Sequence, residues 1–69
     1  MKDLTPRQID TLLFIKQEVK KYENTPSFRR IARHIGIRSP YAVLRHINGL
    51  VFCGYLIKNK QGNYQLTGK

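Results

Sequence analysis

Cationic side chains are the most abundant groups in this chain that could do chemistry, and they are unevenly distributed. The 69 residues carry a formal net charge of +9, and all four acidic residues precede residue 24. Every arginine except Arg7 lies between residues 27 and 52. Such a one-sided excess favours a polyanionic partner such as nucleic acid. The less specific interpretation is that basic surfaces also aid solubility or bind anionic membranes.

The residue types argue against catalysis. The sequence has no paired carboxylates, no glycine-rich phosphate loop and no arrangement of Ser, His and Asp typical of a nucleophilic site. His34 and His46 have no Cys, His or acidic residue at metal-ligand spacing. We therefore expect no enzymatic activity, no cofactor and no metal site. Cys53 is the single cysteine, so no disulfide can form within the chain. We expect its side chain to serve packing, and a free thiol suits a protein of a reducing compartment.

The basic residues lie on two predicted helices joined by a tight turn. Ser27 is a candidate N-cap for a helix over 28–35, and Gly36 is a typical C-terminal stop. Ser39, followed by a proline, predicts the start of a second helix that ends near Phe52. The side chains expected to face the core are Ile31, Ala32, Ile35, Val43, Ile47 and Leu50, with His46 beside them.

A longer helix is predicted ahead of this pair. Thr5 and Gln8 have the spacing of a capping box, and Pro6 suits the first helical position. The helix should run to about Tyr22, and Thr25, which precedes a proline, should be extended. A short strand also fits at this break. The apolar residues at helical spacing in this helix are Leu12, Ile15, Val19 and Tyr22.

The C-terminal part predicts a β-hairpin. Strands are expected over 55–60 and 64–67, joined by a loop that contains Gly62. If Lys60 opposes Tyr64, Leu56 and Leu66 share one face and can cover the core. The fold class predicted for 1–69 is therefore a single, mainly α domain with a small β-hairpin. Its architecture is a winged helix-turn-helix of three helices and a two- to three-stranded sheet.

The exposed side of the helix that follows Ser39 is the predicted surface for double-stranded DNA. Ser39 can cap that helix and also contact DNA. Arg45 is the strongest candidate for a base contact, with a phosphate contact as its alternative. Candidate base contacts are Ser39, Tyr41, Ala42, Leu44, Arg45 and Asn48. Candidate phosphate contacts are Arg29, Arg30, Arg33, Arg38, Lys58 and Lys60, each of which taken singly could be a solvated surface charge.

Some aromatic residues have two interpretations. Tyr41 could contact sugar or phosphate, or cover the end of the preceding helix. Phe52 lies off the buried stripe, so it either packs under the hairpin or is exposed. An exposed Phe52 near Leu13 or Phe14 would indicate an interface. No apolar run is long enough to span a membrane, so we expect a soluble, cytosolic protein.

The sequence resembles the N-terminal DNA-binding domain of the LexA repressors. The most specific matches are Leu4-Thr5 with Arg7-Gln8 near the start, and Arg38-Ser39-Pro40 ahead of the third helix. The spacing is kept without a gap through Gly54. The other matching residues are Met1-Lys2, Pro26, Ile31-Ala32, Gly36, Ala42, His46 and Leu50.

The resemblance implies a winged domain whose third helix enters the major groove, and a dimer on palindromic operators. In that family a small amide stands at the position of Tyr41, and acidic residues stand at those of Leu44 and Arg45. We therefore expect the usual SOS operator to be recognised poorly. The family also continues into a self-cleaving peptidase domain that dimerises it, and residues 1–69 contain nothing of that domain.

Two functions follow from these observations. The first is a sequence-specific DNA-binding transcription regulator, most simply a repressor, that binds either as a homodimer on a palindromic site or weakly as a monomer. The second is a small protein-interaction module that modulates a host repressor or RNA polymerase. The second interpretation rests on Leu44, expected to be exposed, and on Phe52. The fold alone does not decide between the two functions, because one fold hosts many functions.

Overall fold

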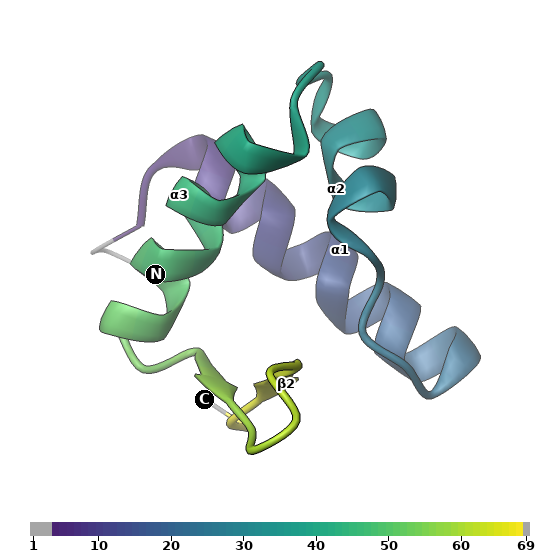
Figure 1. Cartoon of the computed structure of the whole chain (residues 1–69), viewed down its shortest axis with the longest axis vertical. Helices are drawn as coiled ribbons and strands as arrows, with labels where there is room; N and C mark the ends of the chain where they lie inside the picture. The colour runs from purple at the N-terminus through teal and green to yellow at the C-terminus, as the bar shows by residue number, and fades with distance from the viewer. Residues whose placement is uncertain (1–3, 69) are drawn as a thin grey trace.

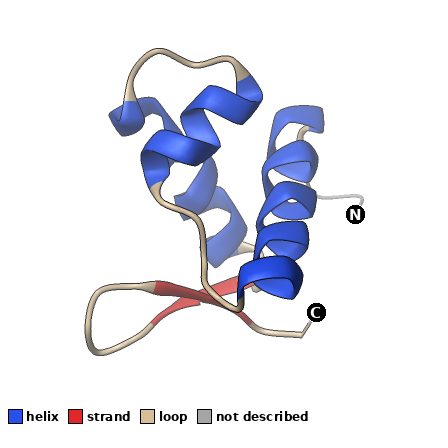
Figure 2. Cartoon of the chain, turned by 90° about the vertical axis from the view of Figure 1, so that its right-hand side faces the viewer, coloured by secondary structure: helices blue, strands red, loops and turns tan. Residues whose placement is uncertain are grey.

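The computed structural model describes residues 4–68, which form three helices and a hairpin. The elements are α1 (Pro6–Tyr22), α2 (Phe28–Ile35), α3 (Pro40–Phe52), β1 (Leu56–Lys58) and β2 (Tyr64–Leu66). The hairpin lies below the helices, at one end of the molecule (Figure 1). Figure 2 shows the two strands crossing beneath the helical layer. The three predicted helices and the winged helix-turn-helix architecture are confirmed.

Each helix begins at a hydroxyl side chain that binds a free backbone N–H. Thr5 accepts from the Gln8 amide at 3.2 Å, and Gln8 Oε1 accepts from the Thr5 amide at 2.9 Å. The predicted capping box is therefore present. Ser27 and Ser39 accept in the same way from the amides of Arg30 and Tyr41. These caps set where α2 and α3 start, and thus where their basic side chains lie.

The core is aliphatic and is shared by all three helices and the hairpin. α3 contributes Val43, Ile47 and Leu50, and β1 contributes Leu56, all fully buried. The remaining core residues are Leu4, Leu12 and Ile15 from the α1 region and Ile31, Ala32 and Ile35 from α2. The predicted buried stripes of α2 and α3 are confirmed, and His46 is half-buried beside the α3 stripe.

The prediction for α1 was wrong at its C-terminal end. Tyr22 does not reach the core and is 52% exposed. Its ring lies instead beside Arg30, 5.7 Å from the guanidinium carbon. Glu18 takes an inner position on this turn because its carboxylate is paired with that same arginine. A cation from α2 thus replaces the aromatic packing that the spacing predicted.

The hairpin has shorter strands than predicted and a different register. Lys58, not Lys60, lies opposite Tyr64, and Leu56 lies opposite Leu66. The register differs by two residues, so each side chain keeps its predicted face and both leucines contact the core. The strands end early because Asn59 organises the loop. Its side-chain oxygen accepts from the amides of Gln61 and Asn63 at 3.0 and 2.9 Å.

No third strand forms beside β2 in residues 4–68, and the sheet has two strands. Thr25 lies next to β2 and its hydroxyl donates to the Tyr64 carbonyl oxygen at 2.6 Å. Pro26 follows it and has no backbone N–H to continue such a ladder. The short strand that also fitted this break is therefore not formed, and one side-chain hydrogen bond connects Thr25 to β2.

Gly49 allows α1 and α3 to approach closely. The Cβ of an alanine at this position would overlap the side-chain amide of Gln8, which is held by the capping box. Glycine inside a helix costs about 1 kcal/mol relative to alanine. We expect Gly49→Ala alone to change stability little, because the gain in helix propensity is offset by loss of the Gln8 contact.

In a Gln8→Ala background the same substitution should raise the free energy of unfolding by about 1 kcal/mol. Urea denaturation of the parent, the two single variants and the double variant measures this coupling. Equal effects of Gly49→Ala in both backgrounds would show that Gln8 does not restrict this position.

Candidate nucleic-acid interface

The turn between α2 and α3 positions the start of the candidate reading helix. Gly36 ends α2 in the left-handed region, with φ 76°, where glycine has no Cβ to clash. Arg7 of α1 donates to the Ile35 carbonyl oxygen at 3.1 Å and so ties α1 to the end of α2. Ser39 then caps α3, and Pro40 occupies its first turn. The N-terminus of α3 therefore has a defined place on the surface.

The side of α3 opposite the core presents the predicted base-contact residues together. Tyr41 is 84% exposed, and Arg45 and Asn48 are exposed on the following turns. Ala42 and Leu44 are half-buried. Helical spacing of three, four and seven residues places Tyr41, Leu44, Arg45 and Asn48 on one face. No ion pair among residues 4–68 engages Arg45. This face combines a free guanidinium with apolar and amide groups.

Three of the predicted phosphate-contact arginines surround one depression beside the turn. The depression has a volume of about 390 Å³ and lies where α2, the turn and the start of α3 meet. Its lining residues are Arg29, Ala32, Arg33, Ile37, Arg38 and Pro40. The described parts of the chain place no acid among them. Three guanidinium groups around a hollow provide a site for an anionic oxygen group.

Arg30 has a different partner from the neighbouring arginines. Its Nη2 and Nε atoms lie 2.6 and 2.9 Å from Glu18 Oε1, and the Glu18 side chain is only 10% exposed. This ion pair joins α1 to α2, and loss of Arg30 would leave the buried carboxylate of Glu18 without its partner, whereas Arg30 itself is 56% exposed. The sequence indicated it only weakly, through a lone acid on the inner side of α1. A phosphate contact by Arg30 stays a prediction.

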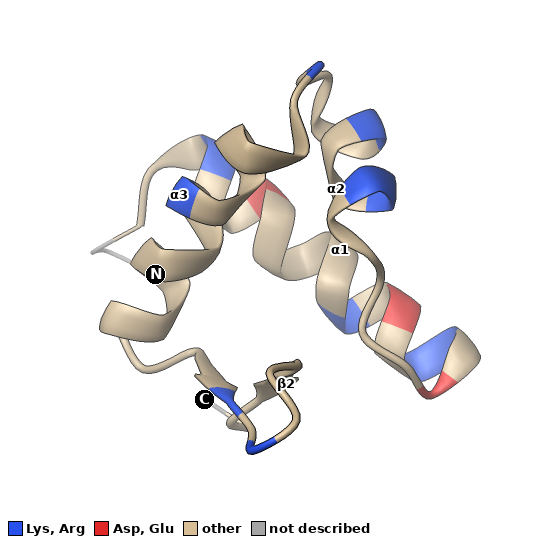
Figure 3. Ribbon diagram, in the orientation of Figure 1, with Lys and Arg blue, Asp and Glu red and all other residues tan. Residues whose placement is uncertain are grey.

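The hairpin adds a second basic group at the other end of α3. Lys58 and Lys60 are exposed, and the Lys58 ammonium lies 5.9 Å from the centre of the Tyr64 ring. Figure 3 shows lysine and arginine on all three helices, the turn and the hairpin, whereas the acidic residues of 4–68 lie along α1 and at its end. Cations therefore flank α3 at both ends.

Phe52 is the most exposed large apolar side chain of this region. It is 92% exposed at the end of α3, so of the two alternatives left open for this ring, exposure holds and packing under the hairpin does not. Its direction follows from its spacing, because it lies four residues after Asn48 and thus on the same outward side. Phe14, in contrast, stacks on His34 with ring centres 4.1 Å apart. Leu13 remains 44% exposed.

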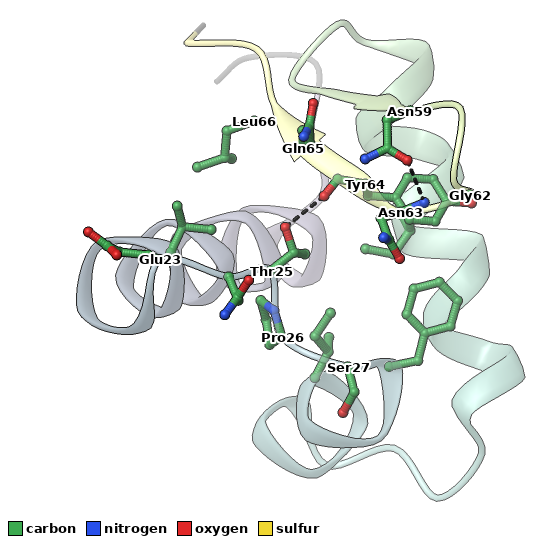
Figure 4. A pocket seen from close by; sticks show the side chains of 15 residues that line it. Glu23, Thr25, Pro26, Ser27, Asn59, Gly62, Asn63, Tyr64, Gln65 and Leu66 are labelled. Atoms are coloured by element: carbon green, nitrogen blue, oxygen red, sulfur yellow. Dashed lines mark hydrogen bonds between the residues drawn. The ribbon is translucent and has the colours of Figure 1, made fainter.

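A larger groove lies between the hairpin and the break after α1. It encloses about 860 Å³ and is lined by Phe28, Tyr64 and several carboxamide side chains (Figure 4). Glu23 is the single charged residue among the described lining residues. No group of three metal-ligating side chains occurs among residues 4–68. The groove therefore presents no set of groups suited to acid–base or metal chemistry.

His46 of α3 is half-buried near two cations, Arg7 of α1 and Arg45 of α3. Burial lowers the pKa of His46 below its ordinary value of 6.5, and the charges of Arg7 and Arg45 lower this pKa further. The neutral imidazole is therefore favoured in the folded protein at neutral pH. A positive charge on His46 would add to an already uncompensated cluster beside the reading face.

The lowered pKa of His46 predicts a loss of stability on acidification. As the pH falls below 6.5, the unfolded chain binds this proton more readily than the folded protein does. The stability contributed by neutral His46 is therefore lost between pH 6.5 and the lower folded pKa. We expect His46→Gln to reduce the fall in Tm between about pH 7.5 and about pH 5. Arg45→Gln, which removes one of the cations, should give an intermediate fall. Identical pH profiles for all three proteins would contradict this account.

The capped helix pair, the basic flanks and the hairpin define the winged helix-turn-helix class of DNA-binding domains. Comparison with known families agrees. The model of the LexA DNA binding domain matches residues 1–62, and the chain belongs to this family.

Curated relatives show the same likeness. The LexA repressor of Thermotoga maritima is 45% identical over 62 residues, covering 90% of this chain and 30% of that protein. LexA repressor 2 of Geobacter sulfurreducens is 36% identical, covering all of this chain and 35% of that protein. The LexA repressor of Geotalea uraniireducens is 34% identical over 86% of this chain and 29% of its own length. The chain thus spans about a third of the length of these relatives.

No helix in the described part of the chain is both long enough and apolar enough to cross a membrane.

Proposed function

We propose that residues 1–69 form one DNA-binding unit that acts as a transcriptional repressor by binding rather than by catalysis. The observation that carries this proposal is the outward face of α3, which lies between two groups of cations and is itself free of acids. A major groove about 12 Å wide accepts one helix and places a phosphate backbone on either side. The bacterial cytoplasm or nucleoid is the location that suits this activity.

The phosphate contacts in this proposal lie at both ends of α3. Arg29, Arg33 and Arg38 would hold one backbone beside the turn, and Lys58 and Lys60 would hold the other beside the hairpin. Such contacts orient the protein without reading sequence. The depression lined by the three arginines supports this assignment, because it can accept one phosphate at the N-terminus of α3.

Base recognition in this proposal depends on Arg45. A guanidinium can donate to both O6 and N7 of guanine, whereas the acid found at this position in the LexA family would accept from cytosine. Ser39, Tyr41, Ala42 and Asn48 would contact neighbouring bases or sugars. The family has a small amide at the position of Tyr41, and this protein has a tyrosine there. We therefore propose that its operator differs from that of the family.

We predict that Arg45→Ala relaxes sequence preference, with a loss of about 1–3 kcal/mol at one guanine and little loss on other duplexes. Arg29→Ala should weaken all duplexes similarly and reduce the salt slope by about 0.9. Fluorescence anisotropy on matched and scrambled duplexes at several salt concentrations measures both effects. An unchanged preference in Arg45→Ala would show that α3 does not read bases through this residue.

Selection from a random duplex pool tests the function as a whole. We expect a consensus that contains guanine, because of Arg45, and two inverted half-sites if the protein binds as a homodimer. A single half-site would contradict the homodimer and keep the DNA-binding function. Recovery of no preferred sequence would contradict the proposal of sequence-specific binding.

The second candidate is a protein-interaction module, and the exposure of Phe52 favours it. An apolar ring held in solvent is a feature of surfaces that bind partners. This candidate predicts no duplex binding at low salt and a stable complex with a repressor or with RNA polymerase in a pull-down. Retention of that complex in Phe52→Ala would contradict it.

A further inference from the structure

We infer that the reading face of α3 recognises the 5-methyl group of a pyrimidine that lies next to a guanine. The inference rests on the proposed function and identifies the chemical feature of DNA that this face reads. The residues concerned are Leu44 and Arg45, with Tyr41 one turn earlier. Thymine and 5-methylcytosine both carry the methyl group at the same place in the major groove.

Leu44 is an apolar side chain that the core does not use. It is half-buried, but it does not belong to the side chains of residues 4–68 that pack against the core cluster, which include Ile37 and Val51. Its neighbours on the same face are the exposed Tyr41 and Arg45. An aliphatic group placed among groove-facing side chains has one complementary feature on a base edge, the methyl group of thymine.

The surroundings of Leu44 also disfavour other bases at this point. Adenine N6 and cytosine N4 each direct amino hydrogens into the major groove. A leucine that covers such a group removes its water and offers no acceptor, which costs free energy. No carboxylate lies within residues 24–68, so no acid can reach in from a neighbouring element on this part of the chain. Thymine presents a methyl group and a carbonyl oxygen, and it avoids this penalty.

Helix geometry places the methyl contact beside the guanine contact when α3 lies along the groove. Leu44 and Arg45 are consecutive residues, and Tyr41 precedes Arg45 by about 6 Å along the helix axis at 1.5 Å per residue. Stacked base pairs are separated by about 3.4 Å. In this orientation the three side chains cover about two base steps, which puts a guanine bound by Arg45 next to a methyl group bound by Leu44.

The test uses the 69-residue protein and the duplex obtained by selection. Each thymine next to a guanine is replaced in turn by uracil, 5-methylcytosine or cytosine, and the affinity is measured. At one position we expect uracil to weaken binding about fourfold, the weight of one buried methyl group. At the same position 5-methylcytosine should bind about fourfold more tightly than cytosine. These two comparisons separate the methyl group from the rest of the base.

Protein variants show whether Leu44 is the side chain responsible. Leu44→Ala should remove both fourfold differences, because removal of the methyl group has no further effect once its protein partner has been removed. Leu13→Ala is the matched control, since Leu13 is an exposed leucine on α1, and it should keep both differences. Arg45→Ala should keep them as well while it loses guanine preference.

Equal affinity for thymine and uracil at every position would overturn the inference, as would a difference that persists in Leu44→Ala. Both results would leave sequence-specific binding intact. Failure of the protein to prefer any duplex would instead overturn the proposed function, so the two failures are distinguishable.

Discussion

The packing of one aliphatic core against both helices of the helix-turn-helix is the interaction on which the rest of the structure depends. Leu12 and Ile15 of α1, Ile31 of α2 and Ile47 of α3 are all fully buried. A chain of about this size buries only about 60% of its unfolded surface, so few contacts hold it together. With this core and three capped helix starts, the orientation of α3 is determined before any ligand is present. A rigid reading helix lowers the entropic cost of binding.

Two acidic residues of α1 interact with basic residues of α2. Glu18 is paired with Arg30, and Asp10 lies 3.3 Å from His34, so both act between α1 and α2. Neither lies beside the turn or the outward face of α3. Burial, followed by the charges of Arg7 and Arg45, lowers the pKa of His46, so a further positive charge on this side of α3 is disfavoured. A polyanion would stabilise the folded state to the extent that it binds this state more tightly than it binds the unfolded chain, which carries the same net charge of +9.

The sequence predicted the helices well because their ends are encoded locally. A hydroxyl residue followed by proline, or a glycine after an apolar stripe, specifies a boundary within a few residues. The errors arose where distant residues compete. The spacing of Tyr22 predicted that it faces the core. Arg30, which comes from another helix, forms an ion pair with Glu18 and also lies beside the Tyr22 ring, which is exposed. The hairpin register depended on Asn59, whose side chain closes the loop early, and composition alone does not reveal such a contact.

The candidate site divides in the same way. Ser39 and the buried stripe of α3 follow from local patterns, so the outward side of α3 could be predicted before the structure was known. The gathering of Arg29, Arg33 and Arg38 around one depression could not, because it depends on how the turn folds back against α2. The exposure of Phe52 also needed the structure, since its position off the buried stripe left open both packing under the hairpin and exposure.

Residues of this chain that match the LexA family near the turn and residues of α3 that differ from it have different physical consequences. The residues that match the family near the turn, such as Gly36 and Pro40, determine where α3 starts on the surface. In the proposed function, Leu44 and Arg45 would determine which base edges are satisfied. An acid accepts hydrogen bonds, whereas arginine only donates them and leucine does neither. Compared with the acids that the family resemblance implies at these two positions, the proposed reading face would have the opposite hydrogen-bonding polarity. A base with an exocyclic amino group, which suits an acid, would be the least suitable partner for Leu44. Under this proposal the same docking geometry would require a different DNA sequence.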